Sequence, residues 1–331
     1  MRKYSVIVPV FNRPQEVKEL LDSLLTQTYK NFEVVIVEDG SSEPCEFLLS
    51  NYSTQLSIQY FFKPNTGPGD SRNFGMERAT GDYFIFFDSD CIIPSQYFSI
   101  LDTELATRPL DAFGGPDNAH ESFSDTQKAI NQAMTSFITT GGIRGRAKQL
   151  DKFQPRSFNM GLSKEVFKNV GGFSDIHPGE DPDLSYRIMN AGYSTGLVAG
   201  AFVYHKRRID FEKFYTQVNK FGMVRVILLK WYPDKAKAVY YLPALFVLGC
   251  AILVLMSLFV HFSLTPLLLL SIVIWAEAIF NTGSLKISLL AVVASYIQLF
   301  GYGIGFLHAA WKIAIKGEDE RKAFPKLFFK K

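Results

Sequence analysis

Cysteine is scarce in this chain of 331 residues, and the three cysteines present cannot all pair with one another. Cys45, Cys91 and Cys250 lie far apart and match no zinc-ligand spacing, which excludes a disulfide framework and argues against a cysteine-based metal or redox centre. Apolar residues, in contrast, make up 47% of the chain, so global disorder is also excluded. The length alone suggests about two structural units.

Net charge is small as well, at +3, but it is unevenly distributed. Residues 1–205 carry a net charge of −7, residues 206–237 carry +6 and residues 312–331 carry +4. Between the two basic segments the only charged residues are Glu277 and Lys286. A protein that binds nucleic acid would carry its basic surface on the folded domain. The distribution therefore predicts a membrane-anchored protein and no nucleic-acid partner.

The region almost free of charge contains three apolar runs, at 239–260, 264–280 and 287–310. The first and third are long enough to span a hydrocarbon core of roughly 30 Å, and the second is marginal. Both flanking segments are basic and favour the cytoplasm, which requires an even number of crossings. Three apolar runs give an odd number, so either one run does not span the membrane or the C-terminal tail lies outside against this rule. The sequence therefore allows two or three spanning helices. The preceding segment, 211–230, has spaced apolar residues among Lys and Arg. It predicts an interfacial amphipathic helix, with a helix packed on a soluble domain as the alternative.

The first hundred residues alternate short apolar runs with helical patterns. The pattern predicts helices at 14–25 and 71–79 and strands at 4–10, 32–37, 56–61 and 82–87. This alternation predicts an α/β fold with a mostly parallel sheet covered by helices. Ligands of such sheets bind beyond the carboxyl ends of the strands, where Asn12, Asp39, Asp88 and Asp90 fall. No secretory hydrophobic segment precedes the first strand, so we expect this domain to be cytoplasmic.

Two carboxylates, Asp88 and Asp90, come directly after the apolar segment 83–87. Placing them together is costly because they repel each other and lose hydration, so a cation is their natural partner. Hard oxygen ligands favour Mg²⁺ or Mn²⁺, which can then hold the oxygens of a diphosphate. Because Asp is common in turns, the position after a buried strand is what favours the metal site.

Two further positions suit a nucleotide. Asp39 can accept hydrogen bonds from a base or ribose, with a helix cap as the alternative, a role for which Ser41 and Ser42 compete. Arg72 lies near the start of a helix that opens with glycines at positions 67 and 69. Backbone amides and a guanidinium there suit a phosphate, and a surface arginine is the alternative.

The stretch Glu180-Asp181 precedes a predicted helix at 182–190. Either carboxylate can simply cap the helix; alternatively, Asp181 is a general base whose pKa the helix terminus keeps low. His205 follows an apolar run and is either a third metal ligand or structural. The adjacent Lys206, Arg207 and Arg208 offset phosphate charge or meet lipid headgroups.

Taken together, these residues resemble the family 2 glycosyltransferases, which have a GT-A fold, over about residues 4–210. The segments that carry the resemblance are Val6-Ile7-Val8-Pro9-Val10-Phe11-Asn12, Glu38-Asp39-Gly40-Ser41-Ser42, Ser71-Arg72-Asn73, Asp88-Ser89-Asp90, Asn159-Met160-Gly161, Gly171-Gly172-Phe173 and Glu180-Asp181. The basic helix and apolar C-terminal region are similar to membrane-bound members that build exopolysaccharide or other envelope glycans, such as the succinoglycan-type transferases.

The resemblance implies a role for each matching residue. Asp39 would contact the base of the nucleotide, Asp88 its ribose or the metal, and Arg72 would approach the donor. Asp90 would be the main ligand of Mg²⁺ or Mn²⁺, with His205 as a further ligand, and Asp181 would be the general base. The other expected substrate-binding residues are Pro9, Asn12, Asn159 and Glu180.

These implications define the expected protein. We expect an inverting transferase that moves a sugar from a nucleotide-diphospho-sugar to a hydroxyl of a lipid-linked or other glycan acceptor in the cell membrane. The expected segments are a GT-A catalytic domain (1–210), an interfacial helix and linker (211–237), two to three transmembrane helices (238–311) and a basic tail (312–331). The Gln-x-x-Arg-Trp motif of processive synthases is absent: Gln217-Val218-Asn219-Lys220-Phe221 lacks its last two residues. Addition of a single sugar is therefore favoured.

Two alternatives belong to other classes. A nucleotidyltransferase should have a glycine-rich loop with Arg or Lys after the first strand, but residues 10–14 contain no glycine. An inactive sugar-nucleotide-binding scaffold would not need the intact Asp90 and Asp181.

Overall fold

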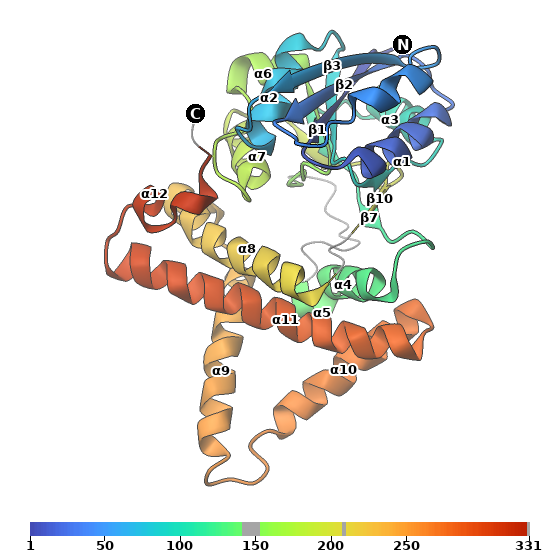
Figure 1. Ribbon diagram of the computed structural model, residues 1–331. Coiled ribbons are helices and arrows are strands. Elements are labelled where there is room, and N and C mark those ends of the chain that lie inside the picture. Colours follow the sequence, from blue (N-terminus) through green and yellow to red (C-terminus); the bar gives the residue numbers. More distant parts are fainter. Residues whose placement is uncertain (141–152, 207–209, 330–331) are drawn as a thin grey trace. The chain divides into compact units, whose positions relative to one another are not determined.

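The computed structural model describes residues 1–140, 153–206 and 210–329 (Figure 1). Its described residues form two compact units. The first contains Met1–Asn118 and the described parts of Lys148–His205 and Phe328–Lys331; the second contains the described parts of Ala119–Ala147 and Lys206–Leu327. Each unit thus combines segments that are distant in sequence, whereas the sequence analysis divided the chain into consecutive segments. The functional roles assigned to those segments remain predictions.

A mixed sheet of seven strands lies at the centre of the first unit. Its order is β3-β2-β1-β4-β8-β6-β9. The strands are β1 (Tyr4–Val10), β2 (Phe32–Asp39), β3 (Ser57–Lys63), β4 (Tyr83–Phe87), β6 (Ala112–Gly114), β8 (Asn159–Ser163) and β9 (Thr195–Leu197). The first four in the sheet order are mutually parallel, whereas β8 is antiparallel to both its neighbours. The predicted strand and helix alternation is confirmed in this parallel part.

Helices cover both faces of this sheet (Figure 1). One face packs against α1 (Pro14–Leu25) and α3 (Tyr97–Thr107). The other packs against α2 (Pro68–Arg78), α6 (Lys164–Val170) and α7 (Glu180–Asn190). Because successive side chains of a strand point to opposite faces, two covered faces bury a strand along its whole length, which explains the continuous apolar runs of the sequence.

A second, three-stranded sheet lies in the same unit, with the order β5-β10-β7. It consists of β5 (Cys91–Ile92), β7 (Asp117–Asn118) and β10 (Val203–His205). In its antiparallel register His205 is opposite Cys91. This pairing brings His205 next to the segment that follows β4, more than a hundred residues earlier in the chain.

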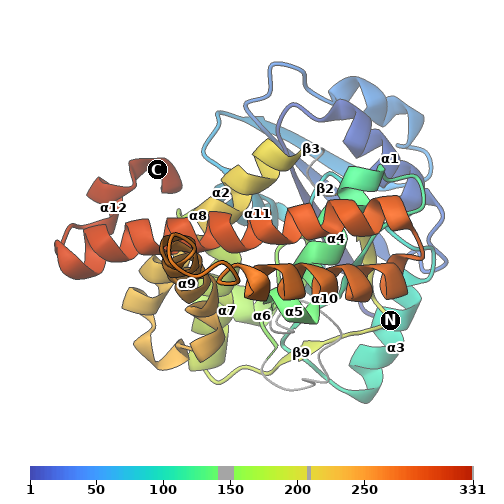
Figure 2. The same cartoon turned by 90° about the horizontal axis from the view of Figure 1, so that it is seen from below.

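The second unit is helical. Its helices are α4 (Asp125–Thr135), α5 (Phe137–Thr140), α8 (Phe211–Trp231), α9 (Leu242–Met256), α10 (Thr265–Thr282), α11 (Leu285–Ala309) and α12 (Glu320–Ala323). Helices α8, α9 and α10 all pack against α11, and Figure 2 shows α10 running beside it. A Cβ at Gly222 of α8 would lie 2.1 Å from the carbonyl oxygen of Tyr302, so glycine permits the close approach of these two helices.

Among the described residues, two helices are long and apolar enough to cross a membrane, judged by length and composition. They are Thr265–Thr282, of which 11% of the apolar window is buried, and Leu285–Ile315, which includes a π-helical turn and is 33% buried. The first apolar run departs from expectation. Its helix, Leu242–Met256, has only 15 residues, since a 3₁₀ turn, Ala238–Tyr240, precedes it and residues 257–260 lie beyond its end. The second run, predicted to be marginal, forms a helix of 18 residues, Thr265–Thr282.

Candidate active site

The carboxyl ends of the parallel strands carry the acidic residues singled out in the sequence. Asp39 is the last residue of β2, Asn12 follows β1, and Asp88 follows β4. The three strands are adjacent in the order β2-β1-β4 and parallel. Their carboxyl ends therefore meet at one edge of the sheet, where α/β proteins bind ligands.

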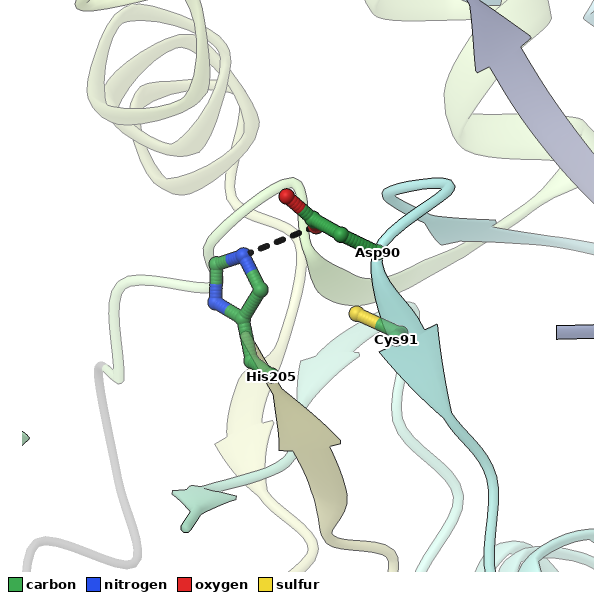
Figure 3. Close-up of side chains that lie close together, drawn as sticks. All are labelled: Asp90, Cys91 and His205. Atoms are coloured by element: carbon green, nitrogen blue, oxygen red, sulfur yellow. Dashed lines mark ion pairs between the residues drawn. The ribbon is translucent and has the colours of Figure 1, made fainter. Parts of the chain in front are cut away.

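Asp88, Asp90 and His205 form a cluster at this edge. Nε2 of His205 lies 3.2 Å from Oδ1 of Asp90 and 3.9 Å from Oδ2 of Asp88. Figure 3 shows the imidazole facing the Asp90 carboxylate. The ring stacks on Phe158, with centroids 4.8 Å apart, which fixes its orientation. Two carboxylates and an imidazole so close together are a donor set suited to a divalent cation.

Two neighbours of this cluster were missed as site residues in the sequence. Nη1 of Arg13 donates to Oδ2 of Asp90 at 2.6 Å. Sγ of Cys91 is grouped with Asp90 and His205, their candidate ligand atoms all lying within 4.8 Å of one another (Figure 3). Burial holds the pKa of the Cys91 thiol well above its usual range, so the neutral thiol predominates at neutral pH. The sequence argument against a cysteine near a metal relied on spacing along the chain and could not foresee the β5–β10 pairing.

Arg72 joins this cluster to the start of α7. Its guanidinium is buried and donates to Oδ1 of Asp88 at 2.7 Å and to Oε1 of Glu180 at 3.2 Å. His177 lies 3.0 Å from the same Glu180 oxygen. Burial alone would raise the pKa of Glu180, but His177 and Arg72 hold it below its usual range. Glu180 is therefore an ionised anchor for Arg72.

Asp181 differs from its neighbour in its protonation. It is half-buried at the start of α7, and burial together with the charge of Glu180 raises its pKa above the usual range of an aspartate. The expectation that the helix terminus keeps this pKa low is wrong, because desolvation and the adjacent carboxylate outweigh the helix dipole. A raised pKa makes Asp181 a stronger base when it is deprotonated.

Asp39 is held by groups that leave it little freedom. Its carboxylate accepts from Nζ of Lys63 at 2.5 Å and from the backbone amides of Thr66 at 3.0 Å and Gly67 at 2.9 Å. Both ionic side chains are buried, and they face each other because Lys63 is the register partner of Asp39 in β3. The two amides precede α2, so the side chain also organises the entry to this helix.

The sequence matches two models of glycosyltransferase families. Residues 5–171, half of the chain, match the family described as Glycosyl transferase family 2, and residues 119–302 match Glycosyl transferase family group 2. This chain belongs to glycosyl transferase family 2. The family resemblance inferred from the motifs is therefore confirmed.

Its relatives include an uncharacterised glycosyltransferase of Haemophilus influenzae, 40% identical over 193 residues, which are 56% of this chain and 61% of that protein. Another, from Rickettsia felis, is 34% identical over 137 residues, 41% of this chain and 22% of the relative. The chain thus spans less than two thirds of the length of either relative.

A solved structure gives the fold. The mannosyltransferase PcManGT from Pyrobaculum calidifontis, in complex with GDP-Man and Mn2+, superimposes with a TM-score of 0.61 at 16% identity, covering 89% of this chain and 87% of that one. This likeness confirms the expected GT-A fold of mixed sheet, covering helices and C-terminal helical region.

In this glycosyltransferase two of the predicted substrate-binding residues have structural partners. Oδ1 of Asn12 accepts from the backbone amides of Ser42 at 2.8 Å and Glu43 at 3.1 Å, and thereby shapes the loop after β2. Asn159 is fully buried; its Oδ1 accepts from the Tyr97 hydroxyl at 2.6 Å, and its Nδ2 donates to the Ala201 carbonyl at 2.8 Å. Their contacts with substrate remain predictions.

Pro9 is half-buried in β1 beyond Ile7, the last residue of that strand paired with β4, so its missing N–H costs no bond to β4. Arg207 and Arg208 lie outside the described residues. Lys63 and His177 were also missed in the sequence analysis. The parallel register of β2 and β3 would have indicated Lys63, whereas nothing local marks His177.

Proposed function

We propose that this glycosyltransferase moves a sugar from a nucleotide-diphospho-sugar to an acceptor hydroxyl with inversion, and that it requires Mg²⁺ or Mn²⁺. The observation that carries the proposal is the cluster of Asp88, Asp90 and His205 at the carboxyl edge of the sheet. The complex of the Pyrobaculum mannosyltransferase with GDP-Man and Mn2+ supports a nucleotide sugar and a divalent cation.

The donor set fits such an ion. Nε2 of His205 lies 3.2 and 3.9 Å from the nearest oxygens of the two carboxylates, near enough for one small divalent cation to contact all three groups. Asp90, Asp88 and His205 would hold the ion. When bound, it would neutralise the charge that develops on the departing diphosphate.

Other side chains of the site would bind the donor and accept the proton of the acceptor. Arg72, fixed by Glu180 and Asp88, supplies a buried positive charge beside the donor phosphates. Asp39 accepts hydrogen bonds from the nucleobase, and Pro9, Asn12 and Asn159 shape the donor site. Asp181 takes the proton of the acceptor hydroxyl as the oxygen attacks the anomeric carbon from the side opposite the leaving group. The charge of Glu180 and burial, which raise the pKa of Asp181, favour this transfer.

The setting of the reaction is the second part of the proposal. We infer a cell-membrane protein anchored by the helices Thr265–Thr282 and Leu285–Ile315, with its catalytic domain cytoplasmic. Basic residues flank the apolar region on both sides, as expected of cytoplasmic ends. An acceptor linked to a membrane lipid, in the synthesis of envelope glycan or exopolysaccharide, fits a site held at a bilayer.

The test measures sugar transfer by the full chain in native membranes, with a panel of labelled nucleotide sugars. Label should move into the lipid fraction, and chelation of divalent cations should abolish the transfer. Asp181→Asn should lower kcat by about 100-fold or more while leaving nucleotide binding unchanged. Because its pKa is raised, activity should fall with decreasing pH at a higher pH than for an ordinary aspartate, and the variant should lose this limb. Full activity of Asp181→Asn would refute the assigned base.

A further inference from the structure

The end of the chain belongs to the catalytic unit, although it follows the helical unit in sequence. After the 3₁₀ turn Pro325–Leu327, Phe328 forms an antiparallel bridge with Ile176. The backbone amide of Phe329 donates to the carbonyl oxygen of Asp175 at 2.9 Å. These bonds attach the C-terminal segment beside the loop that leads into α7.

The side chain of Phe329 lies against two residues of that unit. A Cβ placed on Gly67 would be 2.4 Å from Cδ2 of the ring, so the ring occupies the space that any other residue at position 67 would need. Gly67 also has a φ of +96°, which independently favours glycine. On the other side, the ring centroid of Phe329 is 6.0 Å from that of His177.

Both neighbours are bonded to residues of the candidate site. The amide of Gly67 donates to Oδ2 of Asp39. His177 contacts Glu180, which in turn holds Arg72. One aromatic ring therefore supports the loop before α2 and the loop before α7, from which these carboxylates receive their partners.

We propose that Phe329 is a positioning residue of the donor site, through which the C-terminal segment sets the affinity for the nucleotide. This inference rests on the proposed function. The ring keeps the amide of Gly67 aimed at Asp39 and keeps His177 against Glu180, so that the base-binding and phosphate-binding ends of the site hold a fixed spacing. Loss of the ring loosens both ends directly, and its effect reaches the acidic cluster and Asp181 only through Arg72 and Glu180.

The experiment compares Phe329→Ala, Phe329→Leu and Phe329→Tyr with the intact full chain. The control is Phe47→Ala, which removes an exposed ring elsewhere in the same unit. UDP, GDP, CDP and dTDP are titrated calorimetrically with Mn²⁺ present, and the nucleotide that the intact chain binds is then used for all variants. Thermal melting confirms that each variant is folded, and Phe329→Leu keeps apolar volume if the alanine variant unfolds.

We expect Phe329→Ala and Phe329→Leu to weaken nucleotide binding about tenfold, with a matching rise in donor KM and a change in kcat of less than about twofold. Phe329→Tyr, which keeps the ring, should restore binding, and Phe47→Ala should change nothing. Unchanged affinity in the folded Phe329→Ala or Phe329→Leu protein, beside an intact chain that binds, overturns the inference alone. An intact chain that binds none of the four nucleotides overturns the proposed function and this inference together.

Discussion

Asp39 ends β2 and Asp90 lies shortly after β4, two strands of the parallel part of the same sheet, yet their carboxylates have different kinds of partner. Asp39 is paired with the buried Lys63 and with two backbone amides. Asp90 is paired with Arg13, whose side chain is 35% exposed, and with His205. A fixed, buried set of donors neutralises a carboxylate permanently, whereas a partly exposed arginine can leave. The same residue type near the carboxyl ends of two strands thus has a buried, fixed set of partners in one case and a partly exposed partner in the other.

The largest expected effect concerns Asp90, the carboxylate with the partly exposed partner. Asp90→Asn keeps the shape of the side chain but removes the charge that holds a cation. We expect transfer to fall about 100- to 1,000-fold and Mn²⁺ binding, followed by electron paramagnetic resonance, to weaken with it. Asp22→Asn, which alters a carboxylate of α1, is the matched control and should be nearly silent. Wild-type Mn²⁺ affinity in Asp90→Asn would mean that the ion binds elsewhere.

The next effect compares how much the partners of Asp39 and of Asp90 contribute to the free energy of unfolding. Lys63→Met leaves Asp39 buried without its counter-ion, and we expect it to lower the free energy of unfolding by about 3 kcal/mol. Arg13→Ala removes a partly exposed partner and should cost less than about 1 kcal/mol. Chemical denaturation of the catalytic unit in the full chain measures both. Equal losses would show that the two carboxylates are held alike.

A smaller effect concerns the competition at Asp90. Arg13 donates to one carboxylate oxygen of this residue and would compete with a cation for it. We therefore expect Arg13→Ala to raise Mn²⁺ affinity about two- to fivefold when no nucleotide is present. Arg78→Ala, at the end of α2, serves as the control. A lower affinity in Arg13→Ala would instead identify Arg13 as a support of the ligand geometry.

The smallest effect concerns Glu180, which has one buried partner, Arg72, and one partly exposed partner, His177. Burial alone would lower the pKa of His177, but Glu180 raises it above 6.5. The stabilisation from this pair is therefore complete below pH 6.5 and is lost as the pH rises through the raised pKa of His177. His177→Gln should flatten this part of the profile of unfolding free energy against pH. A decrease that persists in the variant would have another source.

Much of the parallel half of the fold could be predicted from the sequence. Helix α1 has the predicted bounds, 14–25, because Pro14 fits the first turn and the apolar spacing is regular. Strands β1, β2 and β4 were found because buried strands appear as short apolar runs. Strand β3 is only partly buried and was found from its aromatic and β-branched residues. The two-residue strand β5 and the three-residue β10 are too short to be predicted, so the sequence left His205 as either a metal ligand or a structural residue, and only the resemblance favoured the ligand.

The site divides in the same way. Asp88, Asp90 and Asp39 are recognisable because carboxylates after apolar strands are unusual and costly. Their partners Arg13, Lys63 and His177 are ordinary charged residues whose importance depends on the register of strands and the course of loops. The pKa of Asp181 was predicted to be low, but burial and the charge of Glu180 raise it. Glu180 is ionised because His177 and Arg72 lie against it, and Arg72 is 108 positions away in the chain.

The sequence by itself determined the family, the parallel strands and the acidic residues at their ends, because apolar periodicity and local motifs are properties of short segments. Tertiary structure alone decided which cation neutralises which carboxylate, how Asp181 titrates and where Phe329 returns. These depend on residues far apart in the chain, and a charge is stabilised or penalised by whatever folding places within a few ångströms of it.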